Sequence, residues 1–569
     1  MAALTLTEQT RLARLATDRV RRAALARILG SRLLRWRYGA PIADEQLIVP
    51  QELRTADPSF VSEIEVGHFG FGGAVAFIGD GSPFDLVPPS PEWERELHGF
   101  GWLRHLRAAE HEQESARDHA VALVEEWIDR CSKPTGVAWE PSVIGRRLMS
   151  WIASAPLLLE DVEQETYDSI ADSLGDQLIR LSATWRDAPA GYPRLLALTA
   201  LVLADLCVAG HDRHLTEIEK AFSEELESQI MPDGGHISRN PGIPVELLLD
   251  FLPLRQCFAV RDRAAPPALH AAIDRMLPHL RMMRLGDGCL ARFNGMGAPN
   301  VDALATVLAY GDMPVNLPEH APNTGYARLH RGDVVVIADV GPPPSLELAG
   351  QAHAGCLSFE MSAGKWPMLV NCGAPAPADQ DWRAAARATA SHNTLCVAGK
   401  SSSRLVRHDL LESLVGAPPI RFPQHAGGRI ETLADNTIVL EAHHDGYLRK
   451  QGLVHRRRLV LDASGAVLSG VDTLGPPKGQ LRLPVDMPFA IHFHLHPDVA
   501  CNLNAKGTAA EIALLGGARW ELTAEGVQLS VEDSAHCADL SGPRRALQIV
   551  LRGACCGETV VHWQLQRRA

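Results

Sequence analysis

The spacing of the apolar residues changes near the middle of this 569-residue chain, and the change limits the folds open to it. Over residues 91–313 apolar residues recur at helical intervals, as in Ile144, Leu148 and Ile152. Over residues 314–569 they form short alternating runs between Gly and Pro clusters, which is typical of strands. The sequence therefore predicts a helical half followed by a sheet half.

Each half also indicates its own architecture. Residues 194–208 are apolar on nearly all sides, so this helix should be buried against several neighbours. Residues 245–260 predict a second apolar helix with a kink at Pro253. Many such helices favour an α/α toroid, and strand runs without an intervening helix favour an antiparallel β-sandwich. We predict an α+β multidomain chain with a helical and extended segment at 1–90, a toroid at 91–313 and a sandwich at 314–569.

Composition and apolar pattern limit which binding partners and which cellular compartment are expected for this chain. A net charge of −13 argues against nucleic acid as the main partner. The longest apolar run, residues 195–204, is too short to cross a membrane. Residues 9–37 read as an amphipathic helix and lack the continuous apolar stretch of an export signal. Eleven cysteines without a CxxC motif suit a reducing compartment, so the prediction is a cytoplasmic protein.

Two histidines lie in segments that read as β. His353 precedes the alternating run at 357–361, and His392 opens the short run 393–397. Two histidines on neighbouring strands can share one metal ion or one polar pocket with little rearrangement.

Several motifs around these histidines resemble the heparinase II/III family of polysaccharide lyases. The similarity covers about residues 65–500, and its most specific part is Ser391-His-Asn-Thr394. The other parts, in the family's order, are Phe69-Gly-Phe71-Gly-Gly, Trp139-Glu-Pro141, Asp233-Gly-Gly-His236 and Gly325-Tyr326. The resemblance implies an incomplete α/α toroid, a β-sandwich and cleavage of a uronate-containing acidic polysaccharide by β-elimination.

That reaction removes a proton next to a carboxylate and protonates the departing oxygen. It needs a base, an acid and a group that offsets the carboxylate charge. Where the family has an Asn-His pair, this chain has Tyr192 and Arg194, which could replace the pair or simply pack at a helix start. The family's catalytic tyrosine position in the cleft loop is taken by Ile243.

The remaining polar residues give the candidate site. We take Tyr192, His236, Arg239 and Tyr447 as candidate catalytic residues, since they supply phenol, imidazole and guanidinium groups to the expected cleft. Arg194, Asn240, Gln351 and Arg387 are the candidates for substrate binding, and the resemblance places Gln351 where the family has a catalytic histidine.

The resemblance also implies one structural zinc ion. Its ligands would be His353, Asn371 and His392, where Asn371 replaces the family's aspartate. Cys372 would be a stronger ligand if its side chain pointed inward. Without zinc, the two histidines would form hydrogen bonds inside the sandwich.

Three functions remain open at this level. The first is a polysaccharide lyase, and the second is a non-catalytic protein of the same fold that binds polysaccharide. The third is a glycoside hydrolase that uses carboxylates such as Glu140 and Asp233, although these are not visibly paired in the sequence.

Overall fold

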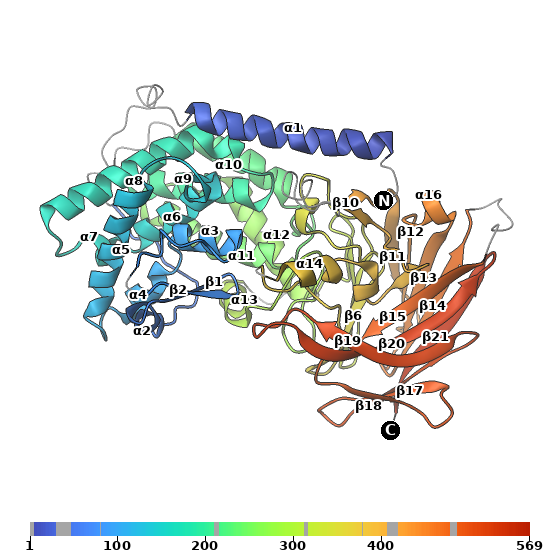
Figure 1. The fold of residues 1–569 in the computed structure, drawn as a ribbon. Helices are drawn as coiled ribbons and strands as arrows, with labels where there is room; N and C mark the ends of the chain where they lie inside the picture. The colour runs from blue at the N-terminus through green and yellow to red at the C-terminus, as the bar shows by residue number, and fades with distance from the viewer. Residues whose placement is uncertain are drawn as a thin grey trace.

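The computed structural model describes residues 5–29, 47–79, 81–209, 215–311, 317–377, 379–406, 419–477 and 486–568. A helical body and a stack of sheets lie side by side, and a long helix crosses both (Figure 1). The expected order of a helical half and an antiparallel sheet half is confirmed. The expected boundary at 313/314 lies outside the described residues.

The helical body is a set of antiparallel helices around an apolar core. Its helices are α3 (Pro91–Gly99), α4 (Leu103–Ala109), α5 (Ser115–Cys131), α6 (Pro141–Ala153), α7 (Ala155–Leu159), α8 (Gln164–Thr184), α9 (Tyr192–Cys207), α10 (Leu215–Gln229), α11 (Ile243–Val260), α12 (Pro267–Met282) and α13 (Val301–Leu308). Helix α9 is buried along most of its length, as its apolar sequence predicts. Helices α6, α9 and α11 each have proline in the first turn, where its missing N–H costs nothing.

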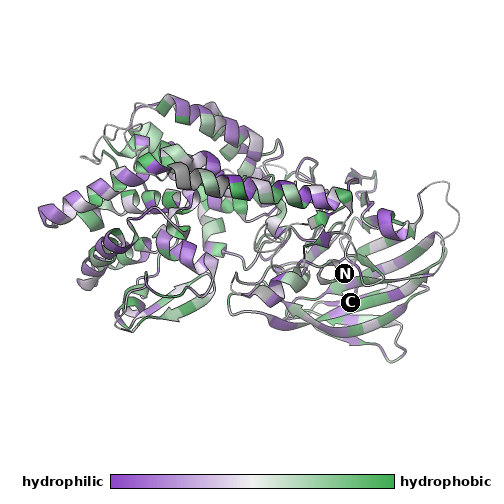
Figure 2. Cartoon of the chain, turned by 45° about the horizontal axis from the view of Figure 1, so that its top comes forward, coloured by the Kyte–Doolittle hydropathy of each residue, from purple (hydrophilic) through white to green (hydrophobic). Residues whose placement is uncertain are grey.

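The sheet half contains three main antiparallel sheets. The first has the order β3 (His320–Ala321), β4 (Tyr326–Arg331), β5 (Val334–Asp339), β6 (Phe359–Ala363) and β7 (Trp366–Leu369). The second has the order β11 (Ala426–Thr432), β12 (Ile438–His444), β13 (Val454–Leu461), β14 (Val467–Gly475), β21 (Thr559–Arg568), β18 (Arg519–Ala524), β17 (Ala509–Ala513) and β16 (Ala500–Leu503). The third has the order β19 (Gln528–His536), β20 (Arg544–Cys555), β15 (Met487–His494) and β8 (Leu395–Val397). Figure 2 shows hydrophilic and hydrophobic residues alternating along strands of the sheet half, as a half-buried sheet requires. In the first sheet, by contrast, β5 and β6 are buried at every position.

The N-terminal segment joins both bodies. Helix α1 (Leu6–Leu29) contacts strand β10 (Pro419–Arg421) at one end and α8 at the other. The helix expected over 9–37 therefore begins earlier, and residues 30–37 lie outside the described part. Helix α2 (Phe60–Glu65) and the hairpin of β1 (His68–Phe71) and β2 (Ala74–Phe77) pack on the helical body. None of the described helices is long and apolar enough to span a membrane.

Hydrogen bonds and close backbone approach hold the toroid against the first sheet. The Asp233 carboxylate accepts hydrogen bonds from the backbone N–H groups of Asn323 and Thr324, both at 2.7 Å. Gly286 lies so close to the turn between β6 and β7 that a Cβ there would approach the Gly364 carbonyl oxygen to 1.9 Å. The two halves therefore meet through a fitted interface, and the candidate site lies along it.

Candidate functional site

A polar pocket lies where the toroid meets the sandwich. Glu92 of α3 and Gly295 line it from the helical half. From the sheet half come Gln351, His353 and two arginines, Arg383 of α14 (Gln380–Ala386) and Arg387 just beyond that helix. Glu92 and Arg383 form an ion pair at 3.5 Å. Arg387 donates from Nε to the Ala352 carbonyl at 2.9 Å and from Nη2 to the Ala349 carbonyl at 3.3 Å, so these donors are used by the loop. The pocket lining brings together guanidinium, amide and imidazole groups with one carboxylate.

The two histidines singled out in the sequence are in direct contact. His353 Nδ1 lies 3.1 Å from His392 Nε2, and the rings are perpendicular. Since His392 Nδ1 donates to the Ala388 carbonyl at 2.8 Å, its Nε2 accepts the proton of His353 Nδ1. Burial lowers the pKa of His353 well below its ordinary value, and His392 and Arg387 lower it further. His353 is therefore a neutral ring beside two arginines.

The third residue expected to bind zinc points elsewhere. Asn371 Oδ1 accepts from the Asn393 backbone N–H at 3.0 Å, and its Nδ2 donates to the Arg292 carbonyl at 3.2 Å. The Cys372 sulfur lies 3.7 Å from His494 Nδ1, away from the histidine pair. Among the described residues, no group of three His, Cys, Asp or Glu side chains could hold a metal ion. Two imidazoles alone do not complete a tetrahedral site, so zinc stays a prediction and no chemistry is derived from it.

His236 is fixed inside the toroid. Its Nδ1 lies 2.7 Å from Ser238 Oγ and its Nε2 lies 2.9 Å from Gln229 Oε1. Gln229 in turn donates to the Gly191 carbonyl at 3.0 Å, at the start of α9. Burial lowers the pKa of His236 to about 3. The ring therefore connects the cleft loop to α9, and it is too weakly basic for a general base near neutral pH.

Arg239 joins the two halves of the molecule. It forms a buried ion pair with Asp339 of β5, and its guanidinium donates to the carbonyl groups of Thr324 at 2.6 Å and Pro342 at 2.7 Å. Burial acts to lower the pKa of Arg239, but Asp339 outweighs it, and the pKa lies above the ordinary value. Asn240 accepts from the Gly242 N–H at 2.9 Å and shapes the turn into α11. Both side chains therefore make contacts that stabilise the fold.

The start of α9 is also engaged in internal contacts. The Tyr192 hydroxyl accepts from Arg146 at 2.9 Å, and Arg146 pairs with the buried carboxylate of Asp250. Burial raises the pKa of Tyr192 to about 12. Arg194 donates to the Ala188 carbonyl at 3.1 Å. The packing alternative for these two residues therefore matches the contacts that they make.

Tyr447 lies in the core of the sandwich. Its hydroxyl donates to the Leu395 carbonyl at 2.9 Å, and the side chain is fully buried. Burial raises the pKa of Tyr447 well above its ordinary value. Neither Tyr192 nor Tyr447 is among the residues that line the pocket. The predicted grouping of Tyr192, His236, Arg239 and Tyr447 around one ligand is therefore not what the structure brings together.

Two pocket residues escaped the sequence reasoning. Glu92 begins the first toroid helix, and Arg383 belongs to the short helix α14. Arg383 stands four residues before Arg387, a spacing that places both on one side of a helical segment. That spacing is the sequence feature that could have identified Arg383.

The carboxylates that a hydrolase would use are not paired. Glu140 binds Arg95 at 2.8 Å, and Asp233 accepts the hydrogen bonds at the interface described above.

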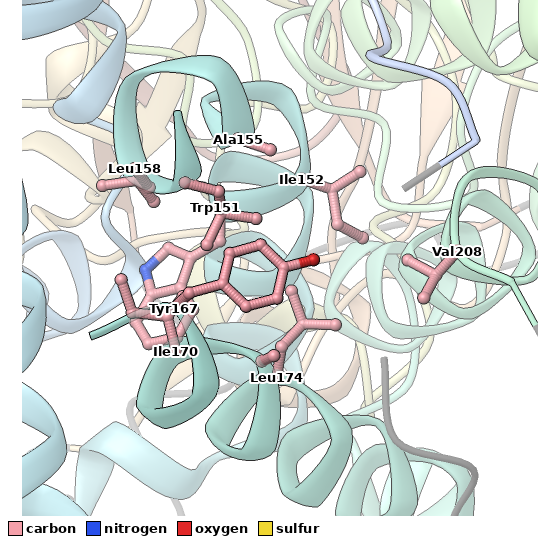
Figure 3. Close-up of a pocket in the computed structure, with 10 residues that line it drawn as sticks. Trp151, Ile152, Ala155, Leu158, Tyr167, Ile170, Leu174 and Val208 are labelled. Carbon is pink, nitrogen blue, oxygen red and sulfur yellow. The ribbon is translucent and has the colours of Figure 1, made fainter. Parts of the chain in front are cut away.

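A second pocket lies within the toroid. Figure 3 shows the Tyr167 ring among the aliphatic side chains of Ile152, Leu174 and Val208. The lining is apolar apart from the tyrosine hydroxyl and the indole of Trp151. Such a lining does not offer the several polar groups that a sugar requires.

A third pocket, lined by Arg107, His111, Arg117 and several glutamates, is polar but lies within the helical half. The interface pocket is the candidate site because residues from both halves line it, among them Gln351, His353 and Arg387 of the sequence prediction.

The buried histidine pair should make the fold sensitive to acid. Burial lowers the pKa of His392 from its ordinary value of 6.5 to about 4. Below pH 6.5, this side chain therefore binds a proton more tightly in the unfolded chain than in the folded one. Stability from this group is complete above pH 6.5 and should fall by about 3 kcal/mol as the pH drops to about 4. We expect His392→Asn to reduce the fall in unfolding free energy over this range in urea titrations, while the other buried histidines keep their own contribution. The matched control is His562→Asn at an exposed position of β21. Equal pH profiles for the two variants would contradict the assignment.

Comparison with known proteins agrees with this architecture. Residues 313–564 match the family described as heparinase II/III-like, C-terminal. The chain is 31% identical over 535 residues to FtsZ-localized protein C of Caulobacter vibrioides (strain NA1000 / CB15N). The aligned region covers 91% of this chain and 89% of that protein. The chain belongs to the heparinase II/III-like family.

Solved structures show the heparinase II/III-like fold over nearly the whole chain. The crystal structure of heparinase III superposes with a TM-score of 0.72 at 14% identity, covering 96% of this chain and 89% of that one. The heparan sulfate lyase HepC mutant from Pedobacter heparinus has a TM-score of 0.61 at 15% identity, covering 98% and 88%. This heparinase II/III-like protein therefore has the fold of polysaccharide lyases, with its polar pocket between the two halves.

Proposed function

We propose that this protein binds an acidic, uronate-containing glycan in the interface pocket and does not cleave it. The observation that carries the proposal is that Arg383 and Arg387 line the same pocket as Gln351 and His353. Guanidinium groups bind carboxylates through two parallel hydrogen bonds, and the amide and imidazole can bind sugar hydroxyls. The fold shared with lyases of acidic polysaccharides supports the same ligand class.

The pocket supplies only part of a β-elimination site. The arginines would offset the uronate charge, but a base and an acid are also needed. His353 is a weak base because its pKa is well below the ordinary value. The phenols of Tyr192 and Tyr447 are held by Arg146 and by the Leu395 carbonyl. Binding is therefore better supported than cleavage by the contacts around the pocket. The lyase alternative is favoured by the fold match alone.

Calorimetry with digalacturonate and with maltose tests the binding. We expect Arg383→Ala and Arg387→Ala each to weaken digalacturonate binding by on the order of tenfold or more, since each removes a positive charge from the pocket. Arg387→Ala also removes the donors to the Ala349 and Ala352 carbonyls, so Arg383→Ala is the cleaner of the two variants. Arg545→Ala, on the exposed surface of β20, is the charge-matched control. Unchanged affinity in both pocket variants would contradict the proposal.

The same samples separate binding from cleavage. Elimination creates an unsaturated uronate that absorbs in the ultraviolet, so a lyase would raise the absorbance of polygalacturonate or heparan sulfate solutions with time. We expect tight binding with constant absorbance. A steady rise that Arg387→Ala abolishes would support the lyase alternative.

We further propose that this chain localises with FtsZ. The identity with FtsZ-localized protein C extends over both halves of the chain, so it includes the toroid as well as the sandwich. Co-sedimentation of the purified protein with FtsZ polymers formed in GTP tests this, with GDP as the control. Recovery in the supernatant under both conditions would contradict it. The cytoplasmic location stays a prediction.

A further inference from the structure

The interface pocket contains a carboxylate beside its cations. Glu92 is the only acidic side chain among the described residues that line the pocket. Its Oε1 accepts a hydrogen bond from Arg383 Nη1 at 3.5 Å, and Arg383 lines the same pocket. A ligand carboxylate that enters the pocket would therefore meet a guanidinium that already has an anionic partner.

The backbone of Glu92 is fixed at the start of α3. Pro91 occupies the first helical position, and the Ser90 hydroxyl accepts a hydrogen bond from the Trp93 N–H at 3.1 Å. Trp93 is buried, and its indole donates to the Phe69 carbonyl at 3.1 Å. The helix start therefore places Glu92 at the pocket wall, and only its side chain can turn away from it.

The side chain of Glu92 is held by one weak contact. Among the described residues, the long hydrogen bond from Arg383 is the only one that its carboxylate accepts. The second oxygen, Oε2, is buried and has no partner there, and a buried oxygen without a donor is unfavourable. Burial raises the pKa of Glu96 on the same helix, and the negative charge of Glu92 raises it further. Glu92 can thus give up Arg383 with little loss.

Arg383 is the pocket cation that a ligand can take over. Arg387 is buried and donates from Nε and Nη2 to the Ala352 and Ala349 carbonyls, so the loop uses these donors. The side chain of Arg383 is 31% exposed, as is that of Glu92. Ion pairs with this much exposure contribute little to stability. One carboxylate can therefore replace another at Arg383 without disturbing the fold.

We propose that Glu92 competes with the ligand for Arg383, so that the carboxylate of the glycan replaces the carboxylate of Glu92 when it binds. The inference rests on the proposed function, because it concerns the ligand of the same pocket. Glu92 is then a specificity-determining residue. A neutral sugar has no anion to exchange for the ion pair, whereas a uronate takes the guanidinium and Glu92 turns to solvent.

The first measurement tests the ion pair without any glycan. Phenylglyoxal modifies guanidinium groups, and an ion-paired arginine reacts more slowly because its partner shields it. We expect the peptide that contains Arg383 to be modified several-fold faster in Glu92→Gln than in wild type, as followed by mass spectrometry. Glu94→Gln is the matched control, because Glu94 lies on the same helix and is not among the residues that line the pocket. Equal rates at Arg383 in all three proteins would overturn the proposal.

The second measurement is a double-mutant cycle on digalacturonate affinity, followed by calorimetry. Glu92→Gln should bind on the order of fivefold more tightly than wild type or Glu94→Gln, because the competing carboxylate is gone. In the Arg383→Ala background the same substitution should change the affinity by less than about twofold, because no guanidinium remains to compete for. An equal gain in both backgrounds would indicate general charge repulsion. Weaker binding by Glu92→Gln would indicate that Glu92 positions Arg383 for the ligand. Either result would overturn the competition.

The binding data also separate this inference from the proposed function. Equal affinity of wild type and Glu92→Gln would end the competition and leave glycan binding in place. Absence of binding in every protein would end both, and the modification rates would still show whether Glu92 shields Arg383.

Discussion

Replacing Arg239 by alanine should lower the free energy of unfolding by about 3–5 kcal/mol, because it leaves a buried carboxylate without its cation. Asp339 is 3% exposed, and water cannot take the place of the guanidinium. The change also removes the donors to the carbonyl groups of Thr324 and Pro342. Since these contacts cross the interface, the toroid and the first sheet should both lose stability.

Urea denaturation followed by tryptophan fluorescence measures this effect. The control is Arg545→Ala, which breaks an exposed pair with Asp533 and should leave the midpoint unchanged. The double variant Arg239→Met with Asp339→Leu removes both charges and should recover part of the loss, because no isolated charge remains buried. A midpoint equal to that of wild type in Arg239→Ala would show that the ion pair does not hold the interface.

Replacing Asp472 by alanine should cost a similar amount, about 3–5 kcal/mol, and should also weaken ligand binding. Asp472 is fully buried and accepts from His455 at 2.7 Å, from Arg457 at 2.7 Å and from the Trp563 indole at 2.8 Å. Arg457 also donates to the carbonyl groups of Leu357 and Asn393. Asn393 follows His392, so the network supports the backbone that carries the histidine pair.

Two readouts distinguish this role from general packing. The unfolding free energy of Asp472→Ala should fall, and its digalacturonate affinity should fall even where the protein is fully folded. Val561→Ala is the packing control, since that side chain lies beside Asp472 in the register of β14 and β21. If both variants lost stability while the Asp472 variant bound the ligand normally, the network would not support the pocket.

The fold could be predicted because its signals are local. The long apolar run at 194–208 becomes α9 and the short apolar run that begins at Val334 becomes β5, since both elements are buried along nearly their whole length and differ in the length of the run. The pairing order of the sheets left no such trace. Strand β21 lies between β14 and β18 by contacts across distant parts of the chain.

The candidate site was predictable only in part. His353 and His392 could be placed together because each stands just before a short strand run, although the structure puts both residues in the loops before β6 and β8 and not in the strands themselves. Arg239 and Tyr447 could not be placed, because a polar residue in a loop has the same sequence signature whether it faces a ligand or a buried partner. The partner of Arg239 is Asp339, a hundred residues further along the chain, and the Tyr447 hydroxyl donates to the Leu395 carbonyl. Side-chain direction depended on tertiary contacts in both cases.

The apolar core of the helical body also includes Tyr326, Val335 and Ile337 of the first sheet. The family match that starts at residue 313 therefore does not mark a unit that could be cut out and exchanged between proteins. Separating the halves would uncover these side chains and leave Asp339 without Arg239. Recombination within the family should then conserve the toroid and the first sheet as one inherited block.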